Sequence, residues 1–323
     1  MTLFLIAVSF VLAMNIGANN SAASMGAAYG AGVRSLKNSL WLVAVFAVLG
    51  AVLAGGRVID TLGSKLISPE VFHNHLSAVV VVLLVATTAV IAANWLRVPV
   101  ATTHAIVCAE VAAGVFYGAL NVPKFLVILA WWILTPLFAL GLSFVLGYLW
   151  YFKILHLVSE LRDEKKIRGT LGGLVTLAGC YVAFSAGSNN AANSVGPLVG
   201  AGYLLSGPAA LLAAAGMGLG AIFFGDRVME TVGKGITELG VARAIMIQLI
   251  CATIVLTASG FGIPVSLGEV VTACIIGLSC ARSGFRKTAQ NDHVVRIAVT
   301  WIVIPLLALI LAYALLWILK ICF

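Results

Sequence analysis

Charged residues are scarce in this sequence. Only 9% of its 323 residues are Asp, Glu, Lys or Arg, and 62% are hydrophobic, whereas a soluble domain is about 25% charged. This composition excludes a soluble globule. Apolar runs that approach or reach the roughly 20 residues needed to cross a bilayer occur at 40–54, 75–95, 125–150, 208–224, 245–260 and 294–319. The sequence predicts an all-α polytopic membrane protein, because the ten-residue alternation of a transmembrane β-barrel is missing.

Motifs of catalysis and metal binding are also missing. The six cysteines are scattered without a CxxC pair and are typical of small buried hydrophobes. There is no HExxH motif, no cysteine–histidine metal spacing and no Ser-His-Asp order in a plausible context. We therefore expect no enzyme, no catalytic residue, no metal site and no cofactor.

Acidic residues are fewer than basic ones, at 11 against 19, which leaves a formal charge of +8. The basic residues cluster in short connections, chiefly 153–168 and 282–296. In a membrane protein this bias marks cytoplasmic loops, so we expect a lipid bilayer and not nucleic acid as the partner. The N-terminus lacks the basic region and cleavage site of a signal peptide. These features predict a multi-pass protein of the cell inner (plasma) membrane.

The chain contains an internal repeat. AMNIGANNSAASMGAAYGAG (13–32) aligns with AFSAGSNNAANSVGPLVGAG (183–202) at an offset of 170, and half of the positions are identical. GGRVIDTLG (55–63) meets GDRVMETVG (225–233) at the same offset, VPVATTH (98–104) meets IPVSLGE (263–269) at 165, and WILTPL (132–137) meets WIVIPL (301–306) at 169. Four blocks in one order predict a first transmembrane repeat at 1–152, a charged cytoplasmic linker at 153–168 and a second repeat at 169–323.

The first duplicated block, which we call the signature, is a candidate binding site. Repeated halves are a hallmark of secondary transporters, whose interrupted helices present backbone termini to substrate and ions at the repeat interface. We expect the helix to break in each copy, so that the restarting helix offers free N–H groups and a positive dipole end to an anion. Amide oxygens of Asn19, Asn20, Asn189 and Asn190 are alternatively ligands for a cation such as sodium. Another alternative is that the small residues and amides only hold helices together. The duplication of the whole stretch makes this packing-only interpretation less favoured.

The third duplicated block has the look of a turn that opens an apolar helix. Thr102, Thr103 and Ser266 are natural oxyanion ligands, and Gly268 allows close backbone approach. His104 and Glu269 occupy equivalent places in the two halves, and either is a candidate carrier of a coupling proton because ionisable groups inside membranes are costly. The alternative for His104 is a histidine bonded to a neighbouring carbonyl. Glu110 is a weaker candidate without an acidic counterpart in the second half.

These blocks resemble a known family. GANNSAASMGAAYGAG (17–32) and AFSAGSNNAANSVGPLVGAG (183–202) resemble the duplicated GANDVANA-type signature of the inorganic phosphate transporter (PiT) family. VPVATTHAIV (98–107) resembles that family's proline-serine-threonine-threonine-histidine hairpin, and the likeness covers essentially the whole chain. The short chain and the 55–63 and 225–233 blocks are most similar to the family's bacterial sulfate permease branch.

The resemblance implies a symporter that imports a tetrahedral inorganic oxyanion. Its fold would be two inverted-topology repeats, with broken helices and re-entrant hairpins at the repeat interface. The substrate residues implied are Asn20, Ser21, Thr102, Thr103, Asn190, Asn193, Ser266 and Gly268. For the coupling ion the resemblance implies Asn19 and Asn189, and we add His104 and Glu269 as the candidate proton carriers argued above from their chemistry.

Two departures from the family pattern bear on the substrate. Asn20 and Asn190 stand where aspartate is usual, and Ala101 stands where the first hairpin usually has serine. Losing two carboxylates removes charge that favours sodium, and a phosphate hydroxyl needs an acceptor that sulfate does not need. We therefore expect sulfate uptake coupled to protons, as the sulfate branch implies.

Two other transport functions also fit the sequence. Sodium-coupled phosphate transport is the alternative. A passive anion channel, a pore with rings of like charge, is a further one, and the duplicated broken helices and the protonatable pair favour a coupled carrier over it. The coupling ion is expected to be a proton or, failing that, sodium. The sequence does not determine the oligomeric state, and a homodimer is one arrangement that it allows.

Overall fold

The computed structural model describes residues 1–96, 101–149, 164–237, 240–289 and 292–322. These segments are almost entirely helical, and their sole bridge pairs Ile67 with Leu120. The helices of the first half are α1 (Thr2–Gly30), α2 (Leu36–Ala54), α3 (Gly56–Asp60), the π-helix η1 (Thr61–Lys65), α4 (Pro69–Asn74), α5 (Leu76–Leu96), α6 (Thr102–Phe116) and α7 (Val122–Leu149). Those of the second half are α9 (Glu164–Asn190), α10 (Ala192–Gly200), α11 (Ser206–Thr237), α12 (Val241–Gly260), α13 (Leu267–Ser283), α14 (Phe285–Ala289) and α15 (Asp292–Cys322).

Long apolar helices confirm the prediction of a polytopic membrane protein. Among the described residues, seven helical segments are long and apolar enough to span a bilayer. In the apolar stretch of α7 only 17% is buried, and in that of α15 only 22%. These helices therefore present a largely apolar surface outward. Such a surface belongs against lipid, since water would not solvate it. The spans lie in α1, α2, α7, α9–α10, α11, α12 and α15.

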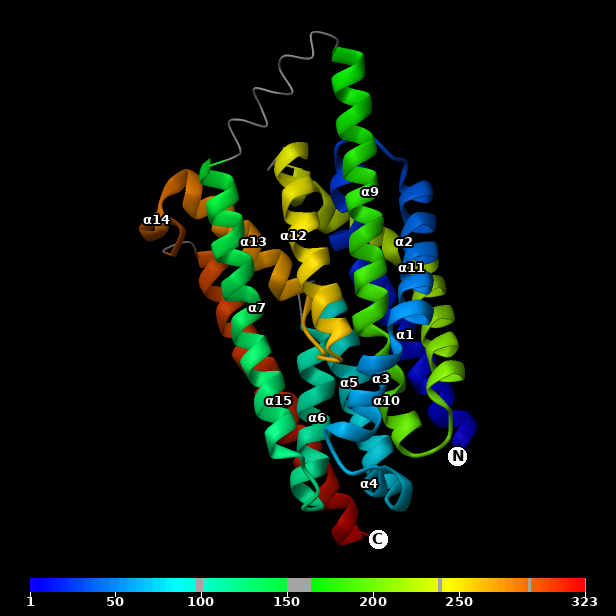
Figure 1. The fold of residues 1–323 in the computed structure, drawn as a ribbon. Helices are drawn as coiled ribbons and strands as arrows, with labels where there is room; N and C mark the ends of the chain where they lie inside the picture. Colours follow the sequence, from blue (N-terminus) through cyan, green and yellow to red (C-terminus); the bar gives the residue numbers. More distant parts are fainter. Residues whose placement is uncertain (97–100, 150–163, 238–239, 290–291, 323) are drawn as a thin grey trace.

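The two halves run in opposite directions. Helix α1 starts at the end of the molecule where the N-terminus lies, whereas α9 starts at the opposite end (Figure 1). Helices α7 and α15, which carry the fourth duplicated block, likewise begin at opposite ends (Figure 1). This arrangement is compatible with the predicted inverted-topology repeats.

Glycines let the halves pack on each other in a reciprocal way. A methyl group on Gly17 of α1 would lie 2.0 Å from the carbonyl oxygen of Met217 on α11, and one on Gly187 of α9 would lie 2.0 Å from that of Ala47 on α2. Both members of each contact are related by the offset of 170. A second reciprocal set joins Gly220 to Met14 and Gly50 to Phe184, at 1.9 Å each. Only glycine permits helix backbones to approach this closely, so the first helix of each half crosses the second helix of the other.

The two signature copies differ in how the helix continues. Helix α1 is unbroken through Asn19 and Asn20, so the interruption predicted for the first copy is not present. The reason is that Gly17 serves close packing, while Ser21 and Ser24 bond back to carbonyls of their own helix. In the second copy α9 and α10 meet at Ala191, whose backbone is itself helical (φ −55°, ψ −40°), and Ile167–Gly200 forms one apolar span, so the predicted wide interruption is not present there either.

The predicted linker falls largely outside the described residues. Of 153–168, the residues up to 163 are not described. The last five, from Glu164 to Arg168, form the first turn of α9. The boundary of the second half at 169 remains a prediction.

Candidate functional site

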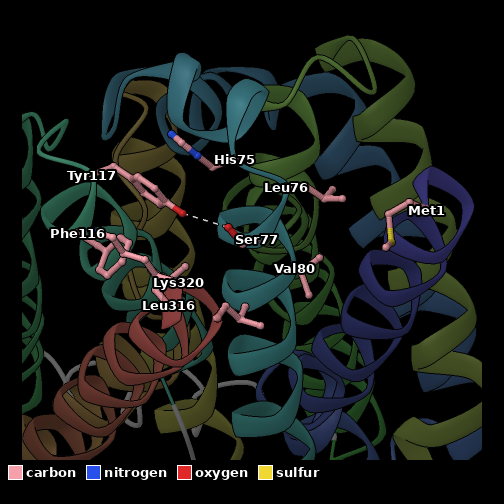
Figure 2. A pocket seen from close by; sticks show the side chains of 10 residues that line it. Met1, His75, Leu76, Ser77, Val80, Phe116, Tyr117, Leu316 and Lys320 are labelled. Atoms are coloured by element: carbon pink, nitrogen blue, oxygen red, sulfur yellow. Dashed lines mark hydrogen bonds between the residues drawn. The ribbon is translucent and has the colours of Figure 1, made fainter. Parts of the chain in front are cut away.

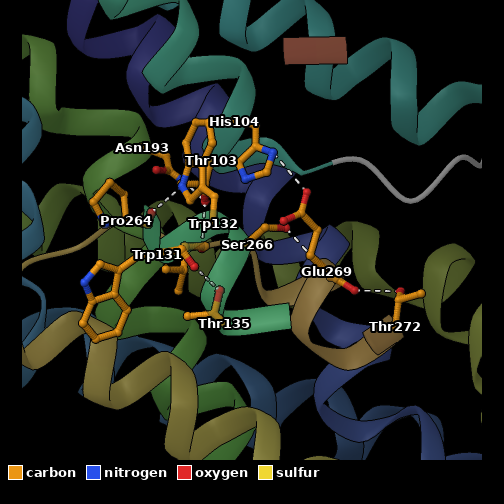
Figure 3. Close-up of polar contacts among 12 residues, drawn as sticks. Thr103, His104, Trp131, Trp132, Thr135, Asn193, Pro264, Ser266, Glu269 and Thr272 are labelled. Atoms are coloured by element: carbon orange, nitrogen blue, oxygen red, sulfur yellow. Dashed lines mark hydrogen bonds and ion pairs between the residues drawn. The ribbon is translucent and has the colours of Figure 1, made fainter. Parts of the chain in front are cut away.

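The centre of the molecule is where α6 and α13 begin, beside the α9–α10 junction. Thr103 of α6 connects all three elements (Figure 3). Its hydroxyl donates to the carbonyl oxygen of Val265 at 3.1 Å and accepts from the amide nitrogen of Asn193 at 3.0 Å. The amide oxygen of Asn190 lies 3.4 Å from the same hydroxyl. All of these side chains are buried, so Thr103, Asn190 and Asn193 form one polar cluster that joins the two halves.

Asn189 holds the turn before α13 in place. Its amide nitrogen donates to Ser259 Oγ and to the carbonyl of Ile263, at 3.0 Å each. Its amide oxygen accepts from the backbone N–H of Val265 at 2.9 Å. Because both ends of the amide are engaged, Asn189 acts in this structure as a clamp on the second hairpin.

His104 and Glu269, predicted as equivalent positions, meet across the repeat interface. Nδ1 of His104 lies 3.0 Å from Oε1 of Glu269, and both side chains are buried. The oxygen lies away from the direction of the N–H bond, so the contact is close without being an aligned hydrogen bond. The pair brings an imidazole nitrogen of the first half and a carboxylate oxygen of the second half into contact in a buried place.

Two neighbours fix the geometry of this pair. The imidazole of His104 packs on the Trp132 ring in a tilted arrangement, with ring centroids 3.7 Å apart and planes at 33°. The Trp132 indole N–H donates to the carbonyl of Pro264 at 2.9 Å. Ser266 caps α13, since its hydroxyl accepts from the backbone N–H of Glu269 at 3.3 Å (Figure 3). Ser266 therefore orients Glu269. The lone pair of the Ser266 hydroxyl that accepts this hydrogen bond cannot also bind an ion.

The first signature copy has fewer contacts. Asn20 is buried and its amide nitrogen has no hydrogen-bond partner in the described part of the chain. Asn19 is half-buried. The Ser21 hydroxyl donates to the carbonyl of Gly17 at 3.0 Å and lies against Gly225 of α11, so the structure does not bring it to the cluster around Thr103.

The first hairpin is described only from Ala101 onward, because 97–100 lie outside the described residues. Thr102 is buried at the start of α6. Gly268 differs from the prediction of close backbone approach: it is exposed, and a methyl group there would meet nothing within 4 Å. Gly268 lies on an outward-facing side of α13, where the Thr272 hydroxyl donates to its carbonyl oxygen at 2.7 Å.

Sequence reasoning missed two residues that support the site. Trp132 lies in the duplicated WILTPL block, so the repeat itself was a signal for it. Ser259, which accepts from both Ser188 and Asn189 at 3.0 Å, carries no sequence signal. Among the described residues, no group of three His, Cys, Asp or Glu side chains lies together as a metal site would need.

A separate pocket of about 830 Å³ lies near the chain termini, away from every predicted site residue (Figure 2). It is mainly apolar. His75 stacks on Tyr117 with centroids 4.0 Å apart, and the Tyr117 hydroxyl lies 3.0 Å from Ser77 Oγ. The lining residues are Met1, His75, Leu76, Ser77, Val80, Phe116, Tyr117, Leu316, Leu319 and Lys320.

Comparison with known proteins agrees with this architecture. Residues 16–312 match the model of the phosphate transporter family. The chain belongs to this family. It is 40% identical over 317 residues to the protein named "Sulfate permease CysP" of Bacillus subtilis (strain 168), with 98% of this chain and 87% of that one covered. A solved structure titled "The sodium-dependent phosphate transporter" shares the fold, with a TM-score of 0.85, 24% identity and coverage of 100% and 99%.

These findings confirm the resemblance drawn from the signature and hairpin motifs. The chain is a multi-pass membrane transporter of an inorganic anion. Its relatives carry names of transporters and permeases rather than enzymes.

Proposed function

We propose that this phosphate transporter family member imports sulfate together with protons. The observation that carries the proposal is the cluster of neutral groups around Thr103, in which Asn190 supplies an amide where the family pattern has a carboxylate and Asn193 adds a second amide. The 40% identity to a protein named as a sulfate permease supports the same choice.

The chemistry of the two candidate anions favours sulfate at such a site. Sulfate carries no proton at physiological pH, so it needs hydrogen-bond donors and no acceptor. Phosphate carries one or two protons, and a bound phosphate hydroxyl needs an acceptor such as a carboxylate. Amide N–H groups of Asn20, Asn190 and Asn193 can supply donors, and the amide nitrogen of Asn20 is a buried donor without a partner among the described residues.

The pair His104 and Glu269 is our proposed carrier of the coupling proton. With an imidazolium and a carboxylate the pair is neutral, and one further proton leaves it with a charge of +1. A positive pair close to the Thr103 cluster favours an anion, and release of that proton weakens the attraction. Proton binding and anion binding would then support each other, as symport requires.

The function is tested by uptake of radiolabelled sulfate and phosphate into proteoliposomes, with a proton or a sodium gradient imposed in turn. We expect sulfate accumulation that follows the proton gradient and does not respond to sodium. Phosphate uptake driven by sodium would contradict the proposal and establish the alternative, in which amide oxygens serve the ion in place of carboxylates.

Two variants test the residues. Asn20→Ala combined with Asn190→Ala should lower sulfate uptake at least tenfold, with Asn38→Ala on the exposed start of α2 as the control. Wild-type uptake by the correctly inserted double variant would remove both asparagines from the site.

Glu269→Gln should abolish the response to the proton gradient, and an unchanged pH profile would remove Glu269 from coupling.

A further inference from the structure

Glu110 is a buried acid that the site described above does not use. It lies in the middle of α6, and its side chain is fully buried. Neither carboxyl oxygen has a hydrogen-bond partner in the described part of the chain. Burying an ionised carboxylate without a partner is far more costly than burying the neutral acid, so the protonated form is favoured in this conformation.

The carboxyl group of Glu110 faces α10, the helix of the second signature. A methyl group on Gly196 would lie 3.5 Å from Oε1 of Glu110. Thr103 precedes Glu110 by seven residues, about two helical turns, so the two side chains share one face of α6. Thr103 is bonded to Asn193, which lies three residues before Gly196 on α10. The interface between α6 and α10 therefore carries the polar cluster near one end and a buried acid about 10 Å further along.

The elements packed around Glu110 carry few ionisable groups. Helix α10 and residues 76–92 of α5 contain none, and on α15 the stretch 299–319 contains only the tyrosine at 313. Lys65 at the end of η1 is exposed. On α6 itself, His104 is directed to Glu269, and Cys108 is the other titratable side chain. Within these described segments, nothing is placed to neutralise an ionised Glu110.

We propose that Glu110 carries a proton in the transport cycle, holding it while α10 covers the carboxyl group and releasing it when that interface opens. The carboxylate takes the proton from water on one side of the membrane and returns it to water on the other. Because Asn193 and Gly196 belong to the same short helix, one movement of α10 changes both the anion contacts and the access of water to Glu110. This inference rests on the proposed proton-coupled function.

The acid belongs to one half of the repeat only. At the offset of 165 that relates the hairpins, the position equivalent to Glu110 is Ile275. The transport cycle would therefore use one buried proton-carrying acid that only the first half supplies. The pair of His104 and Glu269, in contrast, takes one residue from each half.

The first test reads protonation without transport. The infrared carbonyl band of a protonated carboxylic acid should be present in the wild-type protein at neutral pH and should be lost in Glu110→Gln. It should persist in Glu70→Gln, which changes an exposed acid of α4, and in Glu269→Gln. Survival of the full band in Glu110→Gln would overturn the proposal, whatever anion the protein transports.

The second test separates coupling from anion exchange in proteoliposomes. Glu110→Gln should retain exchange of labelled sulfate within about threefold of wild type and lose at least tenfold in accumulation driven by a proton gradient. Retained accumulation would overturn the role of Glu110. If both activities are lost, Glu110→Asp decides: restored accumulation supports a protonatable group at this place, and no restoration overturns it. A wild-type protein that ignores the proton gradient would instead contradict the proposed function.

Discussion

The two copies of the signature have half of their residues in common and yet make different contacts. In the second copy, Asn189 and Asn193 bond to the second hairpin and to Thr103 of the first. In the first copy, the hydroxyls of Ser21 and Ser24 bond to carbonyls of their own helix, and the amide nitrogen of Asn20 has no partner among the described residues. The amides of the second copy are thus already bonded to the two hairpins, whereas the first copy contains a buried amide donor with no partner among the described residues.

The signature motif has two roles, close packing of helices by its glycines and hydrogen bonding by its amides, and the two copies differ only in the second. The glycines at equivalent positions do the same work in both copies, because close approach of helix backbones depends on the local absence of a side chain. The amides do different work, because their partners come from elements far away in the chain. A duplicated motif thus preserves packing while its polar groups diverge in use.

The largest effect should come from the shared glycines. Gly17→Val and Gly187→Val each place atoms about 2 Å from a carbonyl oxygen of a crossing helix, and a backbone cannot rotate away. Overpacking typically costs ~1–3 kcal/mol, and an obstructing backbone places these variants at the upper end of that range, so the yield of folded protein should fall sharply for both. The measurement is the monodisperse fraction after detergent extraction, with Gly173→Val on an unobstructed face of α9 as the control. A well-folded Gly187→Val beside a misfolded Gly17→Val would break the equivalence of the copies.

The next effect should distinguish the two leading asparagines. Asn189→Ala removes three hydrogen bonds, which at ~0.6 kcal/mol each in a membrane protein amounts to about 2 kcal/mol. Asn19→Ala, at the equivalent half-buried position, should lose less. Thermal unfolding of the two variants in the same detergent compares them directly. Equal losses of stability would show that both copies clamp their hairpins to the same degree.

Thr103 provides a sharper test of the link between the halves. Thr103→Val keeps the shape of the side chain but removes the hydroxyl that contacts Val265 and Asn193. We expect sulfate uptake to fall about tenfold, equivalent to about 1.4 kcal/mol. Thr103→Ser retains the hydroxyl and should recover most of the uptake. Full activity of the valine variant would show that the polar cluster is structural only.

The smallest effect should come from the equivalent serines Ser24 and Ser194. The Ser24 hydroxyl donates to the backbone carbonyl of Asn20, and the Ser194 hydroxyl donates to that of Ala191, each at 2.9 Å. Replacing either by alanine should cost less than ~0.6 kcal/mol and change sulfate uptake less than twofold. A selective loss of uptake in one of them would reveal a direct role that these local bonds do not suggest.

The sequence alone was sufficient for those features that depend on local composition or on the repeat. Apolar runs identified the spans, and the register of four duplicated blocks placed Gly17 with Gly187 and His104 with Glu269. The signature and hairpin motifs were enough to identify the family. Hydropathy and duplication are properties of neighbouring residues or of aligned segments, so they can be read without knowing what packs against what.

The tertiary structure alone decided the partners. It kept α1 continuous where a break was expected, engaged both ends of the Asn189 amide, left Gly268 facing open space and turned Glu110 toward Gly196. In a bilayer, lipid solvates apolar helix faces as well as another helix does, so hydrophobicity does not select which helices meet. Close backbone contacts and a few buried hydrogen bonds make that selection, and both are formed between residues that the sequence places far apart.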